Sequence, residues 1–495
     1  MSEKILVIGA GMAGLWTALA LAPTGRQVIL LERDPPPPEG GPEAAFTDWS
    51  RRGVGQLRHS HAFLARLRNL IRDEHPALLA DLLAAGCREL TFQDNLTAAQ
   101  RQSYQPKPVD QDLVILTSRR TTLEFVIRRY VEALPNVTLR PETFVQGLLV
   151  EPGDPPRVTG VRLQDGGELT GDVVVDAGGR TSGATDDLAA IGVALPQEVE
   201  PSGVVYFTRH YRLRPGAEEP PRGKTPATGD LDYLKFGVFP GDNGCFSITL
   251  CCPEVEEELR KAIVDPQVFD AVCNALPGLV PWVDPQRSEA TSRVFGMGDL
   301  LSRWIDLAPE GRPLVLGYVA VGDSLVRTNP LYGRGCSFAA VSAVALRDAL
   351  RATPDPAGRL LGYQARIRQE LRPYYDVMRD TDRQGIRRAR RAMQPAYQPS
   401  LRARLTRSFV EDGVTVALRS DPDLMRAFLR GFHMLEHPQA WLKRPENLAR
   451  VLGYWARGRR RNAEAYRPPA GPGRREMLER LGLSPDADPR RLAAA

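Results

Sequence analysis

The glycines at positions 9, 11 and 14 form the pattern GxGxxG directly after a short apolar run, residues 5–8. Glu32 ends the next apolar run, and a helix-like segment lies between the two. Each glycine has a separate purpose: Gly9 permits a tight turn, Gly11 lets the backbone approach a pyrophosphate, and Gly14 lets the helix pack closely on the strand. The unpaired N–H groups of the helix N-terminus suit phosphates, and the carboxylate of Glu32 suits ribose hydroxyls. The segment predicts a dinucleotide site, with Ala13 and Arg33 as further contacts, but it does not distinguish FAD from NAD.

A second set of small residues lies near position 330. A buried strand over 313–321 is followed by Gly322-Asp323, and the turn Asn329–Cys336 then leads into an expected helix over about 336–351. The order of strand, Gly-Asp, Pro/Gly turn and helix resembles the second flavin motif of the p-hydroxybenzoate hydroxylase superfamily of FAD-dependent monooxygenases. The resemblance implies that Asp323 binds the ribityl chain, and that Pro330, Gly333 and Gly335 face the pyrimidine end of the flavin, where negative charge develops on reduction.

Two further motifs support the same family. Asp176-Ala177-Gly178 stands where the family has an Asp-Gly strand end, although here the second residue is alanine. Arg120 lies three residues before Leu123 at the start of an expected helix, as an FAD-contacting arginine of the family often does, and Arg119 is the adjacent competitor. The resemblance spans residues 5–336 and therefore implies FAD as the cofactor, with Asp176 and Arg120 in its site.

Residues 51–63, RRGVGQLRHSHAF, resemble the GVPQxRHxHxL segment of a branch of this superfamily that includes the polyene epoxidases of polyether pathways. Gly55 and Phe63 depart from that pattern. The resemblance implies an FAD-contacting arginine here, with Arg51 or Arg52 as the candidate and Arg58 next.

His59 and His61 are the candidate catalytic residues of this segment. They could form a metal pair, act as acid and base beside the flavin, or serve as structural hydrogen-bond donors. With no third ligand nearby in the sequence, we expect no metal, and hydrogen bonding near the flavin is favoured over proton transfer.

The resemblance to this superfamily implies that NAD(P)H reduces FAD and that the reduced flavin reacts with O2 to give a C4a-hydroperoxyflavin. That species can epoxidise an alkene or hydroxylate an activated aromatic ring, and we expect a largely apolar small-molecule substrate. Some aromatic side chains of the central strands would line its pocket, and at least half would be core: Tyr206, Phe207, Tyr233, Phe236, Phe239 and Phe246. The sequence does not decide between NADH and NADPH.

Three alternatives stay open. A flavin-dependent reductase of an isoprenoid-like substrate would need no oxygen, and a non-catalytic flavin sensor would need no reductant. A flavin halogenase is disfavoured because its WxWxIP motif is absent: Trp304 is followed by Ile305-Asp306 with no second tryptophan.

The elements that must hold these residues predict an α/β fold. We expect a discontinuous Rossmann-like FAD-binding domain of the hydroxylase type, an inserted antiparallel-sheet substrate domain and a helical C-terminal region, over 1–180 plus 311–355, 181–310 and 356–495 respectively. Residues 93–112 read as a flexible loop, and 467–475 as a linker or tail.

The 495 residues are 42% hydrophobic and 25% charged, with a net charge of +5, which is typical of a globular protein and does not argue for nucleic-acid binding. Six cysteines form no zinc pattern, and we expect them to be reduced thiols. No signal peptide or membrane-spanning run is evident, so we expect a cytoplasmic protein. The arginine-rich run 383–391 predicts either a solvated helix face or a peripheral contact with an anionic membrane.

Overall fold

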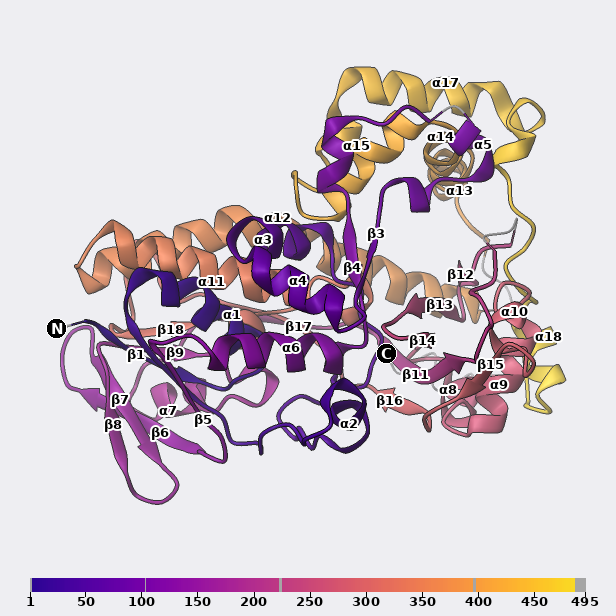
Figure 1. The fold of residues 1–495 in the computed structure, drawn as a ribbon. Helices are drawn as coiled ribbons and strands as arrows, with labels where there is room; N and C mark the ends of the chain where they lie inside the picture. The colour runs from indigo at the N-terminus through magenta and orange to yellow at the C-terminus, as the bar shows by residue number, and fades with distance from the viewer. Residues whose placement is uncertain (1, 103, 222–224, 395–397, 486–495) are drawn as a thin grey trace.

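The computed structural model describes residues 2–102, 104–221, 225–394 and 398–485 (Figure 1). Its centre is a five-stranded parallel sheet in the order β18-β9-β1-β2-β5. These strands are Tyr318–Ala320, Val173–Asp176, Lys4–Ile8, Gln27–Leu31 and Val137–Arg140. The strands β1, β2 and β9 are almost wholly buried, because helices pack on one face of the sheet and residues 145–170 pack on the other.

Helices α1 (Met12–Leu21) and α11 (Gly335–Ala352) pack against each other beside this sheet, with α6 (Arg120–Glu132) next to α1. The GxGxxG turn joins β1 to α1, and the turn after β18 leads into α11. Both turns therefore lie at the carboxyl ends of parallel strands, β1 and β18, which are separated only by β9. Open α/β sheets bind ligands at this edge. A small antiparallel sheet, β6 (Val145–Glu151), β7 (Arg157–Leu163) and β8 (Glu168–Thr170), and the helix α7 (Ala184–Ala190) complete this part of the molecule.

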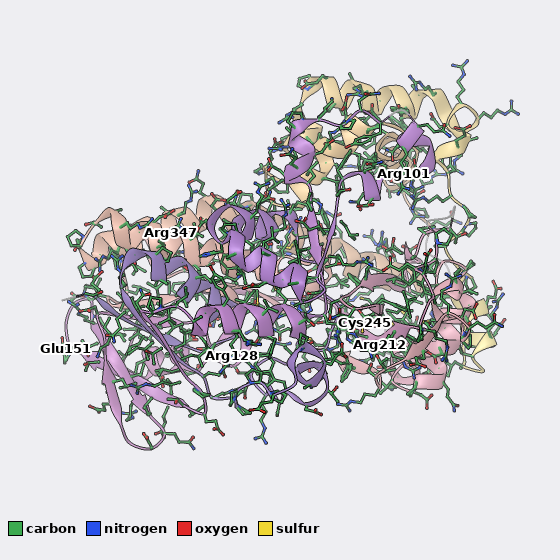
Figure 2. All side chains as sticks on the ribbon, in the orientation of Figure 1. Arg101, Arg128, Glu151, Arg212, Cys245 and Arg347 are labelled. Carbon is green, nitrogen blue, oxygen red and sulfur yellow. The ribbon has the colours of Figure 1, made fainter. Side chains whose placement is uncertain are left out.

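The middle of the chain forms an antiparallel sheet in the order β12-β13-β14-β11-β15, with β16 pairing β11. Its strands are Thr228–Asp230, Lys235–Pro240, Cys245–Pro253, Val204–Leu213, Ser288–Ala290 and Phe295–Met297. Figure 2 marks Arg212 and Cys245, which are paired residues of β11 and β14. The adjacent Cys251 and Cys252 lie in two different apolar clusters, as expected for neighbouring residues of a strand. Helices α8 (Glu257–Ala262), α9 (Pro266–Ala275) and α10 (Val280–Val283) cover one face of the sheet.

A third sheet, of strands β10 (Gln197–Pro201), β17 (Leu301–Ile305) and β19 (Val326–Arg327), crosses the proposed boundary at 310. The C-terminal region also packs against the central antiparallel sheet. Its helix α18 (Arg474–Arg480) buries Met477 and Leu478 in the core of the central antiparallel sheet. The three proposed domains are therefore not independent units.

The C-terminal region begins with the long helix α12 (Pro356–Ala392), which packs on α11. Helices α13 (Leu401–Ser408), α14 (Thr415–Ser420), α15 (Pro422–Phe432) and α17 (Pro445–Arg461) form the upper part of Figure 1, and the short helix α16 (Ala440–Lys443) contacts α15 and α17. Two arginines of the 383–391 run are engaged within the fold, because Arg383 pairs with Glu200 and Arg388 with Asp230. Among the described residues, no helix combines the length and apolarity that crossing a bilayer requires.

The prediction of a flexible loop over 93–112 is wrong. The segment contains the helix α5 (Ala98–Gln102) and packs against α15 through a cluster of apolar side chains that includes Phe92 and Leu429. The buried Asp110 and Arg426 form an ion pair at 2.6 Å across this contact. The polar residues of the segment bind a partner, helix α15, that lies more than 300 residues away in the sequence.

Candidate active site

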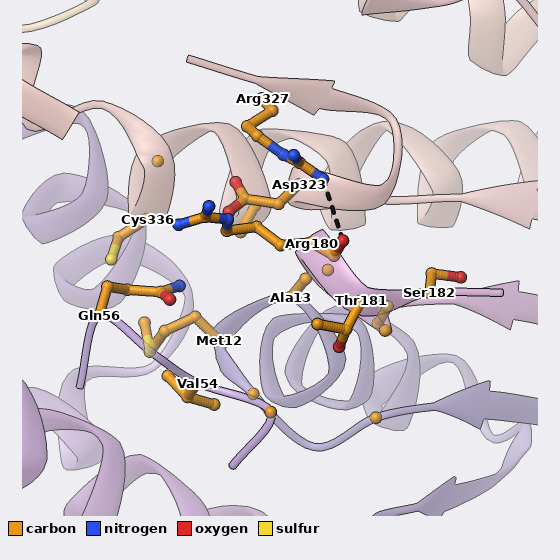
Figure 3. A pocket seen from close by; sticks show the side chains of 18 of the residues that line it. Met12, Ala13, Val54, Gln56, Arg180, Thr181, Ser182, Asp323, Arg327 and Cys336 are labelled. Carbon is orange, nitrogen blue, oxygen red and sulfur yellow. Dashed lines mark hydrogen bonds between the residues drawn. The ribbon is translucent and has the colours of Figure 1, made fainter. Parts of the chain in front are cut away.

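A cavity of about 500 Å³ runs from the GxGxxG turn to the central antiparallel sheet. It is lined by segments that are far apart in the sequence: residues 8–13, 31–33, 51–64, 177–187 and 323–339, with single residues from the central strands. Figure 3 shows one part of it, where Met12 and Ala13 of α1 face Arg180 and Asp323. A volume of this size is typical of a pocket for a small molecule or cofactor.

The three glycines of the first turn have the geometry that the sequence predicts. Gly9 has φ of +94°, and a Cβ there would lie 2.8 Å from the carbonyl oxygen of Ala177. A Cβ on Gly14 would lie 2.0 Å from the carbonyl oxygen of Gly9, so the helix can approach the strand only with glycine at this position. A Cβ on Gly11 would meet nothing closer than 3.9 Å, because its Cα faces the cavity. The turn thus exposes backbone to the cavity at Gly11 and packs backbone on backbone at Gly9 and Gly14.

The side chain of Glu32 is buried at the end of β2 and also lines the cavity. Its carboxylate accepts hydrogen bonds from the backbone N–H groups of Ala10 and Asp34, at 2.8 and 2.9 Å, and from Arg51 at 3.0 Å. A carboxylate has about four acceptor positions, so one remains for a ribose hydroxyl. Arg33 lines the cavity next to it.

Arg51 is the arginine of the 51–58 segment that lines the cavity. Its guanidinium lies among three buried carboxylates, 3.0 Å from Glu32, 3.4 Å from Asp34 and 3.2 Å from Glu124. Its Nε and Nη1 atoms are buried without a hydrogen-bond partner in the described part of the chain. The neighbouring Arg52 is exposed. Arg51 therefore has hydrogen-bonding capacity left for an anion, such as the diphosphate of a dinucleotide.

The prediction that Arg58 contacts the cofactor is wrong. Its guanidinium donates to the backbone carbonyls of Phe46, Thr47 and Trp49, and it does not line the cavity. It ties the end of helix α2 (Gly41–Asp48) to the 51–61 segment. A short sequence pattern could not show which arginine faces inward.

Arg120 lines the cavity, whereas its competitor Arg119 does not. Arg120 donates to Glu124 at 2.6 Å and to the sulfur of Cys336 at 3.2 Å, and so connects α6 to the first turn of α11. Arg119 instead forms a buried ion pair with Asp242 of the central domain. The positions of Glu124 and Cys336 in this network were not predicted from the sequence.

Asp323 faces the cavity and Asp176 does not. Asp323 is surrounded by arginines at positions 120, 180, 303 and 327, and burial still raises the pKa of its carboxyl group above the ordinary value. Asp176 lies beneath the site, where it accepts hydrogen bonds from Tyr318, Ser324 and Ser182. The prediction that Asp176 binds the cofactor is therefore wrong: it joins the ends of β9 and β18, and the loop 177–184 beyond it lines the cavity.

The second turn brings Pro330, Gly333 and Gly335 to the cavity. Gly333 has φ of +63°, and a Cβ there would lie 3.3 Å from the carbonyl oxygen of Ala62. The turn and the 60–62 segment are thus in close contact, and the N-terminus of α11 starts directly behind them.

The two histidines are placed differently. His61 lines the cavity, with its Nδ1 2.9 Å from the carbonyl oxygen of His59. His59 is turned away and lies 3.1 Å from the hydroxyl of Thr208, so the prediction that it is catalytic is wrong. Burial lowers the pKa of both imidazoles to about 3, which makes them neutral at physiological pH. Groups that could form a metal site were not found among the described residues.

The far wall of the cavity comes from the central domain. Tyr206 of β11, Phe239 of β13 and Met297 of β16 form an apolar surface with Leu300, and the hydroxyls of Ser60 and Thr249 add one polar patch. Phe207, Tyr233, Phe236 and Phe246 lie in the core cluster on the other side of the sheet. Strand alternation thus divides the predicted aromatic set. Phe432 of the C-terminal helix α15 also lines the cavity, and no signal in the sequence indicated it.

Comparisons with known proteins agree with this site. Residues 4–103 match the family model described as FAD dependent oxidoreductase. A kynurenine 3-monooxygenase of Salinispora arenicola is 24% identical over 394 residues, which are 76% of this chain and 78% of that protein.

Two solved structures share the fold. The flavin-dependent brominase Bmp2 has a TM-score of 0.60 at 17% identity, over 91% of this chain and all of that chain. PqsL, a probable FAD-dependent monooxygenase from Pseudomonas aeruginosa, has a TM-score of 0.56 at 18% identity, over 78% of this chain and 98% of that chain. The glycine turns and Asp323 thus line one cavity, residues 4–103 are similar to FAD-dependent oxidoreductases, and the chain has the fold of these flavin-dependent structures.

Proposed function

We propose that the protein is an NAD(P)H-dependent monooxygenase that epoxidises or hydroxylates a largely apolar small molecule. The observation that carries the proposal is the shape of the cavity. One continuous space joins the backbone turns of the dinucleotide site to an apolar wall formed by Tyr206, Phe239 and Met297.

The described residues fit FAD. The Cα of Gly11 and the unpartnered Nη1 of Arg51 favour the diphosphate, Glu32 the adenosine ribose, and Asp323 the ribityl chain. The turn Pro330–Gly335 would lie against the flavin ring. When bound, FAD supplies electron transfer from the nicotinamide and the activation of O2.

Three arginines near Asp323 favour the binding of an anionic reductant. Arg180 and Arg327 line the cavity, and Arg303 supports them by donating to the carbonyls of Asp323 and Ser324. In the described ranges none of the three forms an ion pair with a carboxylate, and burial together with Arg303 lowers the pKa of Arg327 to about 10. This surplus of positive charge favours a phosphate-bearing partner such as NAD(P)H.

The apolar wall and the neutral His61 indicate the type of substrate. Ser60 and Thr249 offer one hydrogen-bonding patch, and His61 has no proton to donate as an imidazolium at neutral pH. An alkene needs no base for oxygen insertion, whereas a phenol is helped by one. Epoxidation of an alkene, as in the polyene epoxidases that the 51–63 segment resembles, therefore fits these side chains better than hydroxylation of a phenol.

The test uses the purified holoprotein with NADH or NADPH and a panel of polyenes and aromatic compounds under ¹⁸O2. We expect a product that carries one ¹⁸O atom, and no product without oxygen. Formation of a saturated product under anaerobic conditions would instead establish a flavin-dependent reductase. A product that forms only with added bromide or chloride would establish a halogenase, a reaction named for the structural neighbour Bmp2. If neither NADH nor NADPH reduces the bound flavin, both the monooxygenase and the flavin-dependent reductase are contradicted.

A further inference from the structure

The second turn of the site, residues 329–333, is hydrogen-bonded to the buried carboxylate of Asp382 on helix α12. Asn329 and Tyr332, on either side of Pro330 and Leu331, both donate to Oδ1 of Asp382, at 2.9 Å each. The side chain of Asn329 also accepts from the N–H of Leu331 at 3.1 Å, which fixes the start of the turn. One oxygen atom of α12 therefore holds both ends of the segment that lines the cavity.

Asp382 and Asp176 are buried carboxylates without an ion pair in the described part of the chain, but both oxygen atoms of Asp176 accept hydrogen bonds. Glu32, Glu124 and Asp242 each contact an arginine, whereas Asp382 makes no ion pair within the described ranges. Its Oδ2 atom is buried and has no hydrogen-bond partner there. The groups that face it from other elements are Tyr332 on the turn, Lys235 on β13 and Cys251 on β14, and of these only the more distant Lys235 is cationic at neutral pH.

The free Oδ2 atom is the position for a proton. A proton on Oδ2 leaves Oδ1 as an acceptor for both donors, but it removes the charge that strengthens the two hydrogen bonds. Burial raises the pKa of Asp382 to about 6, against the lowering effect of the bonds from Asn329 and Tyr332. The two hydrogen bonds to Oδ1 therefore weaken as the pH falls through about 6, which is close to physiological pH.

We propose that Asp382 is a positioning residue for the flavin: its ionised carboxylate holds the Asn329–Gly333 turn in place against the cavity, and its protonation loosens that turn. The proposal rests on the assignment of this turn to the flavin. Linkage requires reciprocity: if the ionised form favours the bound turn, then binding of FAD must release a proton near pH 6. The C-terminal helix α12, which the family motifs do not cover, thereby acts on the cofactor site.

The variant Asp382→Asn tests this role because asparagine imitates the protonated side chain. The dissociation constant of FAD is measured by reconstitution of the apoprotein between pH 5.5 and 8, with flavin fluorescence as the readout. We expect the wild type to bind FAD more tightly as the pH rises through about 6, by up to about tenfold in all. Asp382→Asn should keep the weaker value at every pH, and Tyr332→Phe should fall between the two. The matched control is Asp380→Asn, which changes an exposed aspartate on the same helix and should behave like the wild type.

Thermal unfolding of the apoproteins separates positioning from a purely structural role. Because the folded-state pKa is above the unfolded value, stability falls as the pH rises from about 4 to about 6, and the full loss is present above about 6. Asp382→Asn should therefore melt at or above the wild-type temperature at pH 8 while it binds FAD less tightly. The proposal is overturned if the variant keeps the wild-type pH dependence, or if it loses FAD and melts at a lower temperature. If the wild type binds no FAD at any pH, the flavin assignment itself fails, which is a different result from an unaffected variant.

Discussion

Replacement of Arg51 by methionine tests the charge balance of the proposed diphosphate site. The guanidinium is 1% exposed and lies within 3.4 Å of three carboxylates that are 4%, 4% and 0% exposed. Methionine fills most of the volume but leaves Glu32 without a cation close by, whereas Asp34 keeps Arg33 at 4.0 Å and Glu124 keeps Arg120. Removal of one partner from a buried ion pair costs about 3–5 kcal/mol, because the remaining charge stays desolvated. With an unfolding entropy of about 2.1 cal/mol/K per residue, the loss corresponds to a decrease in melting temperature of roughly 3–5 °C for the chain of 495 residues.

The assay compares Arg51→Met with Arg52→Met, which removes an exposed arginine from the adjacent position. Thermal unfolding of the apoproteins at pH 7.5 should show this decrease for Arg51→Met only. The double variant Arg51→Met/Glu32→Gln should recover part of it, because it removes one of the uncompensated carboxylates. FAD binding should be lost in both variants that lack Arg51. A melting temperature within about 2 °C of the wild type for Arg51→Met would refute the reasoning, since it would mean that the carboxylates are solvated or protonated.

Three further predictions follow from the same geometry. Gly14→Ala should abolish FAD binding and destabilise the N-terminal domain, because its Cβ would overlap the carbonyl oxygen of Gly9; normal flavin absorbance in the purified variant would contradict this. Arg58→Met should retain FAD with nearly unchanged affinity but increase proteolysis near residue 50, because this arginine holds backbone carbonyls; a large loss of affinity would return Arg58 to the cofactor site. Stability should fall as the pH decreases below 6.5, with a slope of up to about 1.4 kcal/mol per pH unit for each histidine whose pKa is lowered, because these histidines gain protons on unfolding; a melting temperature that is constant from pH 6.5 to 5 would contradict this. The pKa is about 3 for His59 and His61 and about 4 for His210 and His433, and burial also lowers the pKa of His75.

The parts of the site that the sequence could predict are those in which a local pattern has a direct geometric meaning. The contact of Gly14 with Gly9 is made within one turn, so the spacing of the glycines is sufficient to specify it. The same holds for Glu32, which ends the strand paired in parallel with β1. The second turn is also local, because Pro330 and Gly333 determine its shape through their own backbone angles.

The errors concern residues whose role depends on distant segments. Arg58 and Asp176 match the family patterns in type and position, but their partners are carbonyls and hydroxyls that only the folded chain brings to them. His59 and His61 are two residues apart but face different directions, because the backbone bends at His59 and is not a regular strand there. The sequence alone does not show which one faces the cavity. The folded structure shows that His59 packs against Thr208 of the central domain.

Sequence motifs predict even less of the C-terminal region. It carries no recognised motif, yet two of its residues contribute to the site. Phe432 completes the cavity wall, and Asp382 holds the turn that lines the cavity from the opposite side. The wall that a substrate would meet is formed by the central strands and by α15, outside the segments that carry the cofactor motifs. The identity of the substrate should therefore be sought from the side chains around Tyr206 and Phe432, and variants at these two positions should change which compounds are oxidised more than they change the binding of FAD.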